Sequence, residues 1–164
     1  TASSTSSARS TRPWSSCCPR SWARAPTPSD LTALRLNKRG RILVHRRSEQ
    51  VSRFPGLYEV EVGGAANVGE SYEQAATREL AEELGIRALP RLLFTFINRS
   101  GLSPHWLGVH EAVVPDAVVP DPDEVAWHGW LTEPELRSAL LEWRFTLDSH
   151  EAFSRYLAFR TARS

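Results

Sequence analysis

The chain has 164 residues and a mass of 18.4 kDa, a size that suits one domain and leaves too little chain for two cores. Hydrophobic residues make up 41% and charged residues 24%, close to the globular average, which argues against disorder along the whole chain. The formal net charge of +1 provides no basic field, so nucleic acid is not an expected partner. No apolar run approaches the roughly 20 residues of a membrane helix and no secretory signal is visible, so we expect a cytoplasmic protein without membrane contact.

The N-terminal segment differs in composition from the rest of the chain. Residues 1–30 contain nine Ser but no Leu, Ile, Val, Gly, Lys or Glu. Without branched aliphatic side chains the segment cannot build a core face, so we expect disorder over residues 1–29. Cys17 and Cys18 are adjacent, which gives neither a disulfide framework nor a spaced metal cluster. The globular domain is expected over residues 30–164.

From residue 30 onward, alternating hydrophobic residues predict strands. Residues 31–36 and 42–44 flank a turn that ends at Gly40, which predicts a hairpin. A third strand is predicted over residues 57–62, ended by Gly63 and Gly64. Further strands are expected at residues 92–97, 106–114 and 125–131.

The clearest helix is predicted over residues 72–84. Ser71 is a good N-cap, and Gln74 three residues later completes a capping box. The segment lacks Gly and Pro and is rich in Ala, Glu and Leu. Gly85 follows where a left-handed C-terminal cap belongs.

Two more helices are predicted near the C-terminus. Thr132 and Glu135 form a second capping box. Asp148 or Ser149 is expected to cap a last helix that runs to about residue 159. Strands and helices thus mix along the chain, which predicts an α/β or α+β fold with helices packed on a mixed sheet.

Three carboxylates gather on the helix predicted over residues 72–84. Glu79, Glu82 and Glu83 stand at positions i, i+3 and i+4, within an arc of roughly 100°. They repel one another, and the last two lie near the negative end of the helix dipole. A hard divalent cation such as Mg²⁺ removes this conflict, because it takes carboxylate oxygens and substrate phosphates as ligands.

The residues around the cluster support the same interpretation. Arg78 is placed to pair with Glu82 or with Glu70 and to hold a carboxylate in position. Gly64 lets the backbone approach, so its carbonyl is a further candidate oxygen ligand. The alternative is a solvated acidic helix face, but that alternative leaves the bracketing glycines, Glu70 and Arg78 unexplained.

These residues form a pattern that resembles a known family. Gly64-x5-Glu70-x7-Arg78-Glu79-Leu80-x-Glu82-Glu83-x-Gly85-Ile86 matches the box of the Nudix hydrolases at every specified position. Outside the box, the chain resembles the subgroup related to isopentenyl-diphosphate isomerase at residues 45–48, 54–56, 62–64, 69–73, 123–125 and 143–148.

The resemblance implies a fold, a reaction and a set of roles. The fold is an α/β/α sandwich with a mixed sheet and a loop-helix-loop, and the reaction is hydrolysis of a diphosphate linked to another moiety, usually a nucleoside, with Mg²⁺ or Mn²⁺. Glu79 and Glu83 are then metal ligands, and Glu82 is a ligand or the general base. Glu70, Arg78 and Gly85 support them.

Residues outside the box have two interpretations each. Glu124 is a candidate general base on a later loop, or a surface acid. Arg46 and Arg47 are candidates for gripping a substrate phosphate, or strand-end surface charges. Relatives often carry Lys where this chain has Val51, so that contact is lost unless Arg53 replaces it.

Aromatic residues are also ambiguous. Phe54, Tyr58 and Trp106 are candidates for stacking on a base, but such residues more often belong to a core.

Two rival functions are weaker. Isomerase chemistry needs a Cys at the position of Gly63 and histidine metal ligands, which this sequence lacks. A non-catalytic binding module is the second alternative, but the glutamates that such modules usually lose are all present. We expect a small-molecule diphosphate as substrate, and homodimerisation is open.

Overall fold

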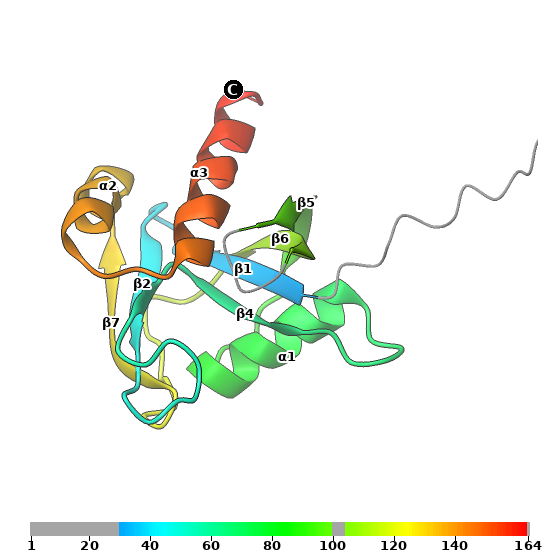
Figure 1. Ribbon diagram of the computed structural model, residues 1–164, viewed down its shortest axis with the longest axis horizontal. Coiled ribbons are helices and arrows are strands. Elements are labelled where there is room, and N and C mark those ends of the chain that lie inside the picture. The colour runs from blue at the N-terminus through cyan, green and yellow to red at the C-terminus, as the bar shows by residue number, and fades with distance from the viewer. Residues whose placement is uncertain (1–29, 100–103, 164) are drawn as a thin grey trace, which may run out of the picture.

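The computed structural model describes residues 30–99 and 104–163, which form one mixed sheet and three helices (Figure 1). The strands are β1 (Asp30–Leu36), β2 (Ile42–Arg47), β3 (Tyr58–Glu59), β4 (Glu61–Ala65), β5 (Arg91–Asn98), β6 (His105–Val113) and β7 (Val125–Leu131). The helices are α1 (Tyr72–Leu84), α2 (Glu133–Glu142) and α3 (Leu147–Thr161). The disorder predicted for residues 1–29 falls outside the described residues.

Strand β1 lies at the centre of the sheet. The order is β3-β2-β1-β6-β5, with β4 also paired to β1 and β7 to β2. β1 runs antiparallel to β4 and parallel to β6. It meets β2 through a single register pair, Leu36 with Ile42, so the sheet divides beyond the predicted hairpin.

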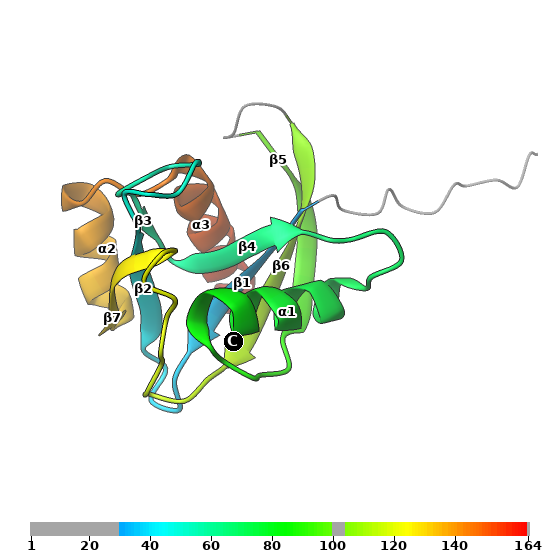
Figure 2. The same ribbon diagram turned by 90° about the horizontal axis from the view of Figure 1, so that it is seen from below.

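Helices cover both faces of the sheet, as the sandwich prediction required (Figures 1 and 2). The alternation along β1 explains the two cores, because successive side chains point to opposite faces. Leu34 packs with Leu136 and Phe153 on the side of α2 and α3. Ala33 packs with Ala75 and Ala76 of α1 on the other side. The α/β class and the sandwich are therefore confirmed.

Helix α1 has the bounds that its sequence signals predict. Ser71 accepts a hydrogen bond from the backbone N–H of Gln74, whose side chain accepts one from the N–H of Ser71. Gly85 ends the helix with φ 63°, in the left-handed region that favours glycine. Local signals fix this helix at both ends.

Two predicted boundaries are wrong. The third strand is two strands: the chain leaves β2 at Glu59 and joins β1 from Glu61 onward, so Gly63 and Gly64 lie inside β4 instead of ending it. Helix α3 is capped by Thr146, whose hydroxyl accepts from the N–H of Ser149 at 3.2 Å, and not by Asp148 or Ser149.

Candidate active site

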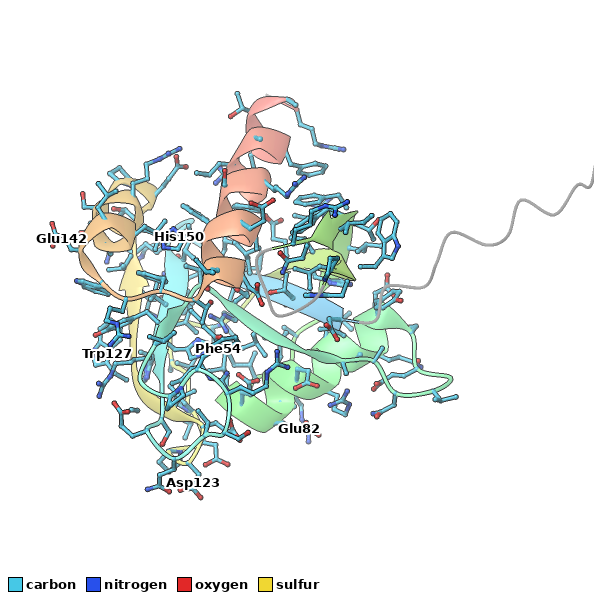
Figure 3. The ribbon with its side chains drawn as sticks, in the orientation of Figure 1. Phe54, Glu82, Asp123, Trp127, Glu142 and His150 are labelled. Carbon is cyan, nitrogen blue, oxygen red and sulfur yellow. The ribbon has the colours of Figure 1, made fainter. Side chains whose placement is uncertain are left out.

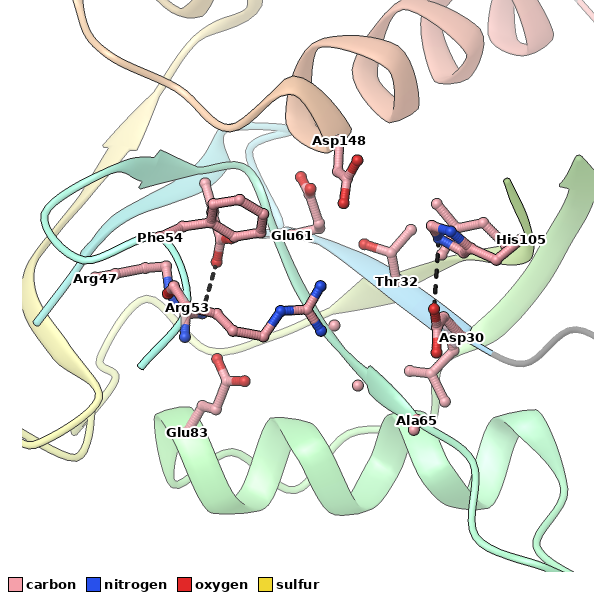
Figure 4. A pocket seen from close by; sticks show the side chains of 15 residues that line it. Asp30, Thr32, Arg47, Arg53, Phe54, Glu61, Ala65, Glu83, His105 and Asp148 are labelled. Carbon is pink, nitrogen blue, oxygen red and sulfur yellow. Dashed lines mark hydrogen bonds and ion pairs between the residues drawn. The ribbon is translucent and has the colours of Figure 1, made fainter. Parts of the chain in front are cut away.

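A pocket of about 240 Å³ opens beside β4, between α1 and the start of α3 (Figure 4). Strands β1 and β4 supply its floor, and the loop between β2 and β3 brings in Arg53 and Phe54. Glu83 enters from α1, and Asp148 enters from the first turn of α3. Segments distant in the chain therefore converge on one cavity.

Arg78 binds three glutamates on the α1 side of the site. Its Nε donates to Glu70 at 3.0 Å, and its Nη1 donates to Glu79 at 2.7 Å and to Glu82 at 3.2 Å. Its Nη2 also donates to the carbonyl of Ala65 at 3.1 Å. The hydrogen bond from Arg78 lowers the pKa of Glu70, and the bonds to Glu70 and Glu79 raise the pKa of Arg78. The pairing predicted for Arg78 is present with both expected partners.

The side chain of Glu83 points from α1 into the pocket and makes no ion pair or hydrogen bond to any described residue (Figure 4). Burial, with the nearby charge of Glu59, raises the pKa of Glu83 to about 8. Burial also raises the pKa of Glu79, although Arg78 opposes the shift. Both carboxyl groups therefore bear a desolvation cost that a bound cation would offset.

The oxygen donors beside α1 suit a hard divalent cation, and Gly64 brings the backbone up to them. A Cβ at Gly64 would collide with the carboxylate of Glu79, so glycine permits this approach without displacing that side chain. Over residues 30–99 and 104–163, however, no three acidic, His or Cys side chains converge closely enough to hold a metal ion. Arg78 holds Glu79 and Glu82 while Glu83 faces the pocket, so convergence requires these carboxylates to turn from Arg78.

Of the predicted site residues, Gly64, Glu83 and Arg47 line the pocket, and seven lie outside its lining: Glu70, Arg78, Glu79, Glu82, Gly85, Arg46 and Glu124. The side chain of Glu82 is 60% exposed and projects from the side of α1 away from β4 (Figure 3). Arg46 is paired with Glu49 at 3.5 Å on the surface. Glu124 is exposed, and its backbone accepts from the N–H of Ser48 at 2.8 Å. Their predicted roles stay predictions.

The loop between β2 and β3 carries the cations of the pocket. Arg47 lines the pocket, but it donates to Glu59 at 3.1 Å and to the carbonyl of Arg53 at 2.9 Å. Through these two bonds Arg47 stabilises the conformation of the loop. Arg53 reaches into the pocket and makes no ion pair with any described residue, and its guanidinium carbon lies 5.6 Å from the centre of the Phe54 ring.

Of the three aromatic residues singled out in the sequence, Phe54 lines the pocket. Its φ of 52° is in the left-handed region, unusual for a residue with a side chain. Tyr58 instead packs against Trp143, with ring centres 4.7 Å apart. Trp106 is half-buried in β6.

A chain of buried polar residues lies behind the pocket. The fully buried Arg35 donates to the carbonyl of Leu43 at 3.0 Å and lies 3.3 Å from Nδ1 of His45. The Nε2 of His45 is 3.3 Å from Glu59, although outside hydrogen-bond geometry. Burial lowers the pKa of Arg35 to about 10 and also lowers that of His45. Burial opposes ionisation of Glu59, but contact with His45 and Arg47 outweighs it and lowers the pKa of Glu59.

Sequence reasoning missed the wall opposite α1. Glu61 is buried on β4, and Ser149 Oγ lies 3.0 Å from both of its carboxyl oxygens. Burial, with the charge of Glu59, raises the pKa of Glu61 to about 8. Asp148 accepts from the amide of the buried Asn98 at 2.9 Å. The sequence offers little signal for this wall, because Glu59 and Glu61 alternate with Tyr58, Val60 and Val62 as they would on a half-exposed strand.

This arrangement, with an acidic helix beside a pocket at the division of a mixed sheet, agrees with the comparisons with known proteins. A family model described as the NUDIX domain matches residues 26–154. An uncharacterised Nudix hydrolase of Streptomyces coelicolor is 46% identical over 126 residues, which cover 75% of this chain and 70% of that protein. A Nudix hydrolase of Deinococcus radiodurans is 34% identical over 103 residues, covering 61% and 60% of the two chains.

Solved structures share the fold. The crystal structure of a Deinococcus radiodurans protein superposes with a TM-score of 0.68 at 28% identity, covering 78% of this chain and 82% of that one. A Nudix domain of Shewanella oneidensis, crystallised with ADP ribose, superposes with a TM-score of 0.59 at 19% identity, covering 78% and 86% of the two chains.

The chain belongs to the Nudix family, and with relatives named as Nudix hydrolases it is a hydrolase of pyrophosphate bonds. The comparisons name the family and not the isomerase-related subgroup, which stays a prediction. Among the described helices, none has both the length and the apolar character needed to span a bilayer.

Proposed function

We propose that this protein is a divalent-metal-dependent hydrolase that cleaves the diphosphate bond of a nucleoside diphosphate-linked or related small molecule. The observation that carries the proposal is the meeting of an intact Nudix helix with a pocket that contains an unpaired arginine. Glu83 and Arg53 line the same cavity, so carboxylates for a cation and a guanidinium for a phosphate lie together.

Glu79, Glu82, Glu83 and the carbonyl of Gly64 are the residues that would hold Mg²⁺ or Mn²⁺. When bound, the cation supplies charge for the phosphoryl oxygens and lowers the pKa of a water molecule. Arg78 pairs with Glu79 and Glu82 and lowers the repulsion between them, and both carboxylates would turn from Arg78 to join Glu83 on the cation. Glu82 is a further ligand or the general base by its place in the family pattern, although its side chain lies outside the pocket lining.

Arg53 is the candidate residue for binding the diphosphate of the substrate. Arg47 is already neutralised by Glu59, whereas Arg53 has no carboxylate partner among the described residues. A guanidinium suits bidentate contact with phosphate oxygens. Arg53 thus supports the interpretation in which it replaces the lysine that relatives carry at the position of Val51.

The alternatives have less support. A non-catalytic nucleotide-binding module would tolerate loss of a box glutamate, but all are present. Isomerase chemistry lacks its thiol, because Gly63 stands on the pocket floor where a Cys is needed.

The test is phosphate and pyrophosphate release from a panel of nucleotides and nucleotide conjugates, with Mg²⁺, Mn²⁺ or EDTA. We expect metal-dependent turnover that EDTA abolishes and that Glu82→Gln lowers by about 100-fold. Glu142→Gln makes the same chemical change on α2, far from the pocket (Figure 3), and should leave turnover unchanged.

Turnover that persists in EDTA, or equal rates for the two variants, would contradict the proposed mechanism. A folded protein that binds nucleotides without turning over any panel member would instead indicate the binding module. Cytoplasmic location and homodimerisation stay predictions.

A further inference from the structure

We propose that the end of the pocket formed by Thr32, Glu61 and Asp148 binds a hydroxyl-bearing group, a ribose or another sugar, attached to the diphosphate. We call these three residues the acidic end. This inference rests on the proposed function and adds to it the chemical class of the group beside the diphosphate.

The pocket has two ends of different charge. Arg53, on the loop between β2 and β3, lies at one end, and Glu61 and Asp148 lie at the wall opposite α1 (Figure 4). His105, at the acidic end, is 3.4 Å from Asp30. An anionic phosphate is attracted to the arginine, whereas the carboxyl groups of Glu61 and Asp148 offer it no positive charge. The acidic end therefore suits groups that donate hydrogen bonds.

Both carboxyl groups of the acidic end are held by buried partners. Ser149 Oγ lies 3.0 Å from each carboxyl oxygen of Glu61, and Thr146 donates to that same hydroxyl at 3.0 Å. Asn98, which is fully buried, donates to Asp148 at 2.9 Å. Solvated surface acids lack such support, whereas fixed acceptors are what selective hydrogen bonding requires.

Thr32 supplies an independent indication of a ligand. It is 3% exposed, and its hydroxyl makes no hydrogen bond to the described part of the chain. Its side chain lies between Glu61 and His105 in the pocket (Figure 4). A buried hydroxyl without a partner costs about 1–3 kcal/mol, a cost that a ligand hydroxyl would remove.

The strand register keeps space open beside Thr32. Thr32 pairs with Gly63, and Leu34 pairs with Glu61, so positions 32, 63 and 61 face the same side of the sheet. A Cβ at Gly63 would lie 4.0 Å from the Thr32 hydroxyl and 3.1 Å from the carbonyl of Leu31. Glycine leaves that volume to a ligand.

Hydroxyl groups satisfy all three residues, because each hydroxyl both donates and accepts. A prenyl or other hydrocarbon chain would leave Thr32 unpaired and desolvate Glu61 and Asp148 without compensation. The acidic end thus favours a sugar diphosphate or nucleoside diphosphate over a hydrocarbon diphosphate.

The test compares each of the common ribonucleoside diphosphates with its 2′,3′-dideoxy counterpart in the Mg²⁺-dependent hydrolysis assay. We expect kcat/KM to be about 10- to 100-fold higher for the ribose form, since each hydrogen bond contributes about tenfold. Thr32→Val removes the hydroxyl at constant volume and should reduce that ratio several-fold, while Thr32→Ser should retain it. Arg137→Ala, on the exposed side of α2, is the surface control.

The ratio separates this inference from the proposed function. Hydrolysis with equal kcat/KM for ribose and dideoxy substrates would overturn the inference and leave the hydrolase standing, as would a ratio unchanged by Thr32→Val. If no diphosphate is hydrolysed, the same pairs are compared by calorimetric titration in Mg²⁺. In that case, tighter binding of the ribose form supports this inference although the proposed hydrolase function has failed. Equal binding, or no binding, overturns both.

Discussion

The two acidic walls of the pocket are built in opposite ways. On the α1 wall, Arg78 holds Glu70, Glu79 and Glu82 in a network that solvent reaches. On the other wall, neutral buried groups hold the carboxyl groups, as Ser149 does for Glu61. A charged network at the surface can exchange its arginine for another cation, whereas a buried neutral one keeps its geometry. The first wall is suited to a metal and the second to an uncharged ligand.

The largest expected effect is that of Glu61, in the buried wall, on the pH dependence of stability. Burial and the charge of Glu59 raise the pKa of Glu61 from 4.5 to about 8, so the folded state binds a proton that the unfolded state releases above about pH 4.5. The stability that this proton contributes is complete below that pH and is lost as pH rises through 8. The expected slope approaches 1.4 kcal/mol per pH unit.

Glu61→Gln removes this contribution and keeps the side-chain volume. Urea denaturation at several values between pH 5 and pH 8 should show a flatter profile for the variant than for the wild type. The pKa of Glu83 is also raised to about 8. Its contribution to the pH dependence is the same in the wild type and the variant, so it cancels when the two profiles are subtracted. Parallel profiles would show that Glu61 is ionised in the folded state.

The second expected effect concerns Arg53, which lies between the walls. Arg53→Gln should raise KM for a diphosphate substrate about tenfold or more, because a charge-assisted contact to phosphate is lost, with little change in melting temperature. Arg47→Gln should instead lower stability, because Arg47 joins Glu59 to the loop carbonyl of Arg53. Steady-state kinetics and thermal melting on both variants check this, and the reverse assignment of effects would refute it.

The smallest expected effect is the difference in unfolding free energy between removing the N-cap of α1 and removing the N-cap of α3. Ser71 caps α1 at an exposed position, while Thr146 is 2% exposed and also donates to Ser149. Thr146→Ala should cost about 2 kcal/mol of unfolding free energy and Ser71→Ala about 1 kcal/mol or less. Chemical denaturation gives both values, and equal costs would mean that the bond from Thr146 to Ser149 contributes nothing.

The sequence signals that worked are local. The capping box of Ser71 and Gln74 and the glycine at position 85 fix both ends of α1, because every group involved lies within a turn or two of chain. The spacing of Glu79, Glu82 and Glu83 is local for the same reason. Family resemblance then supplied the sandwich, which the alternation of strands alone left between two fold classes.

The features that were missed depend on pairing between distant segments. The division of the third strand at Val60 follows from the change of partner from β2 to β1, which no periodicity within residues 57–62 records. The acidic end needs Thr32, Glu61 and Asp148 to converge from two strands and a helix. The cap of α3 was misplaced because Thr146, Asp148 and Ser149 are all good capping residues, and packing selects among them.

The single register pair between β1 and β2 has a mechanical consequence. It divides the molecule into two wings: β4, β1, β6 and β5 with α1 on one side, and β3, β2 and β7 with α2 on the other. Arg53 belongs to the wing of β2, β3 and β7, because it lies on the loop between β2 and β3. Glu83 belongs to the other wing, because it lies on α1. A rotation about the hairpin at Gly40 and the crossing at Val60 would change the separation of Arg53 and Glu83, but it would also disturb both cores, because each core contains residues of both wings. The packing of the two wings into shared cores therefore sets the distance across the pocket that both wings line.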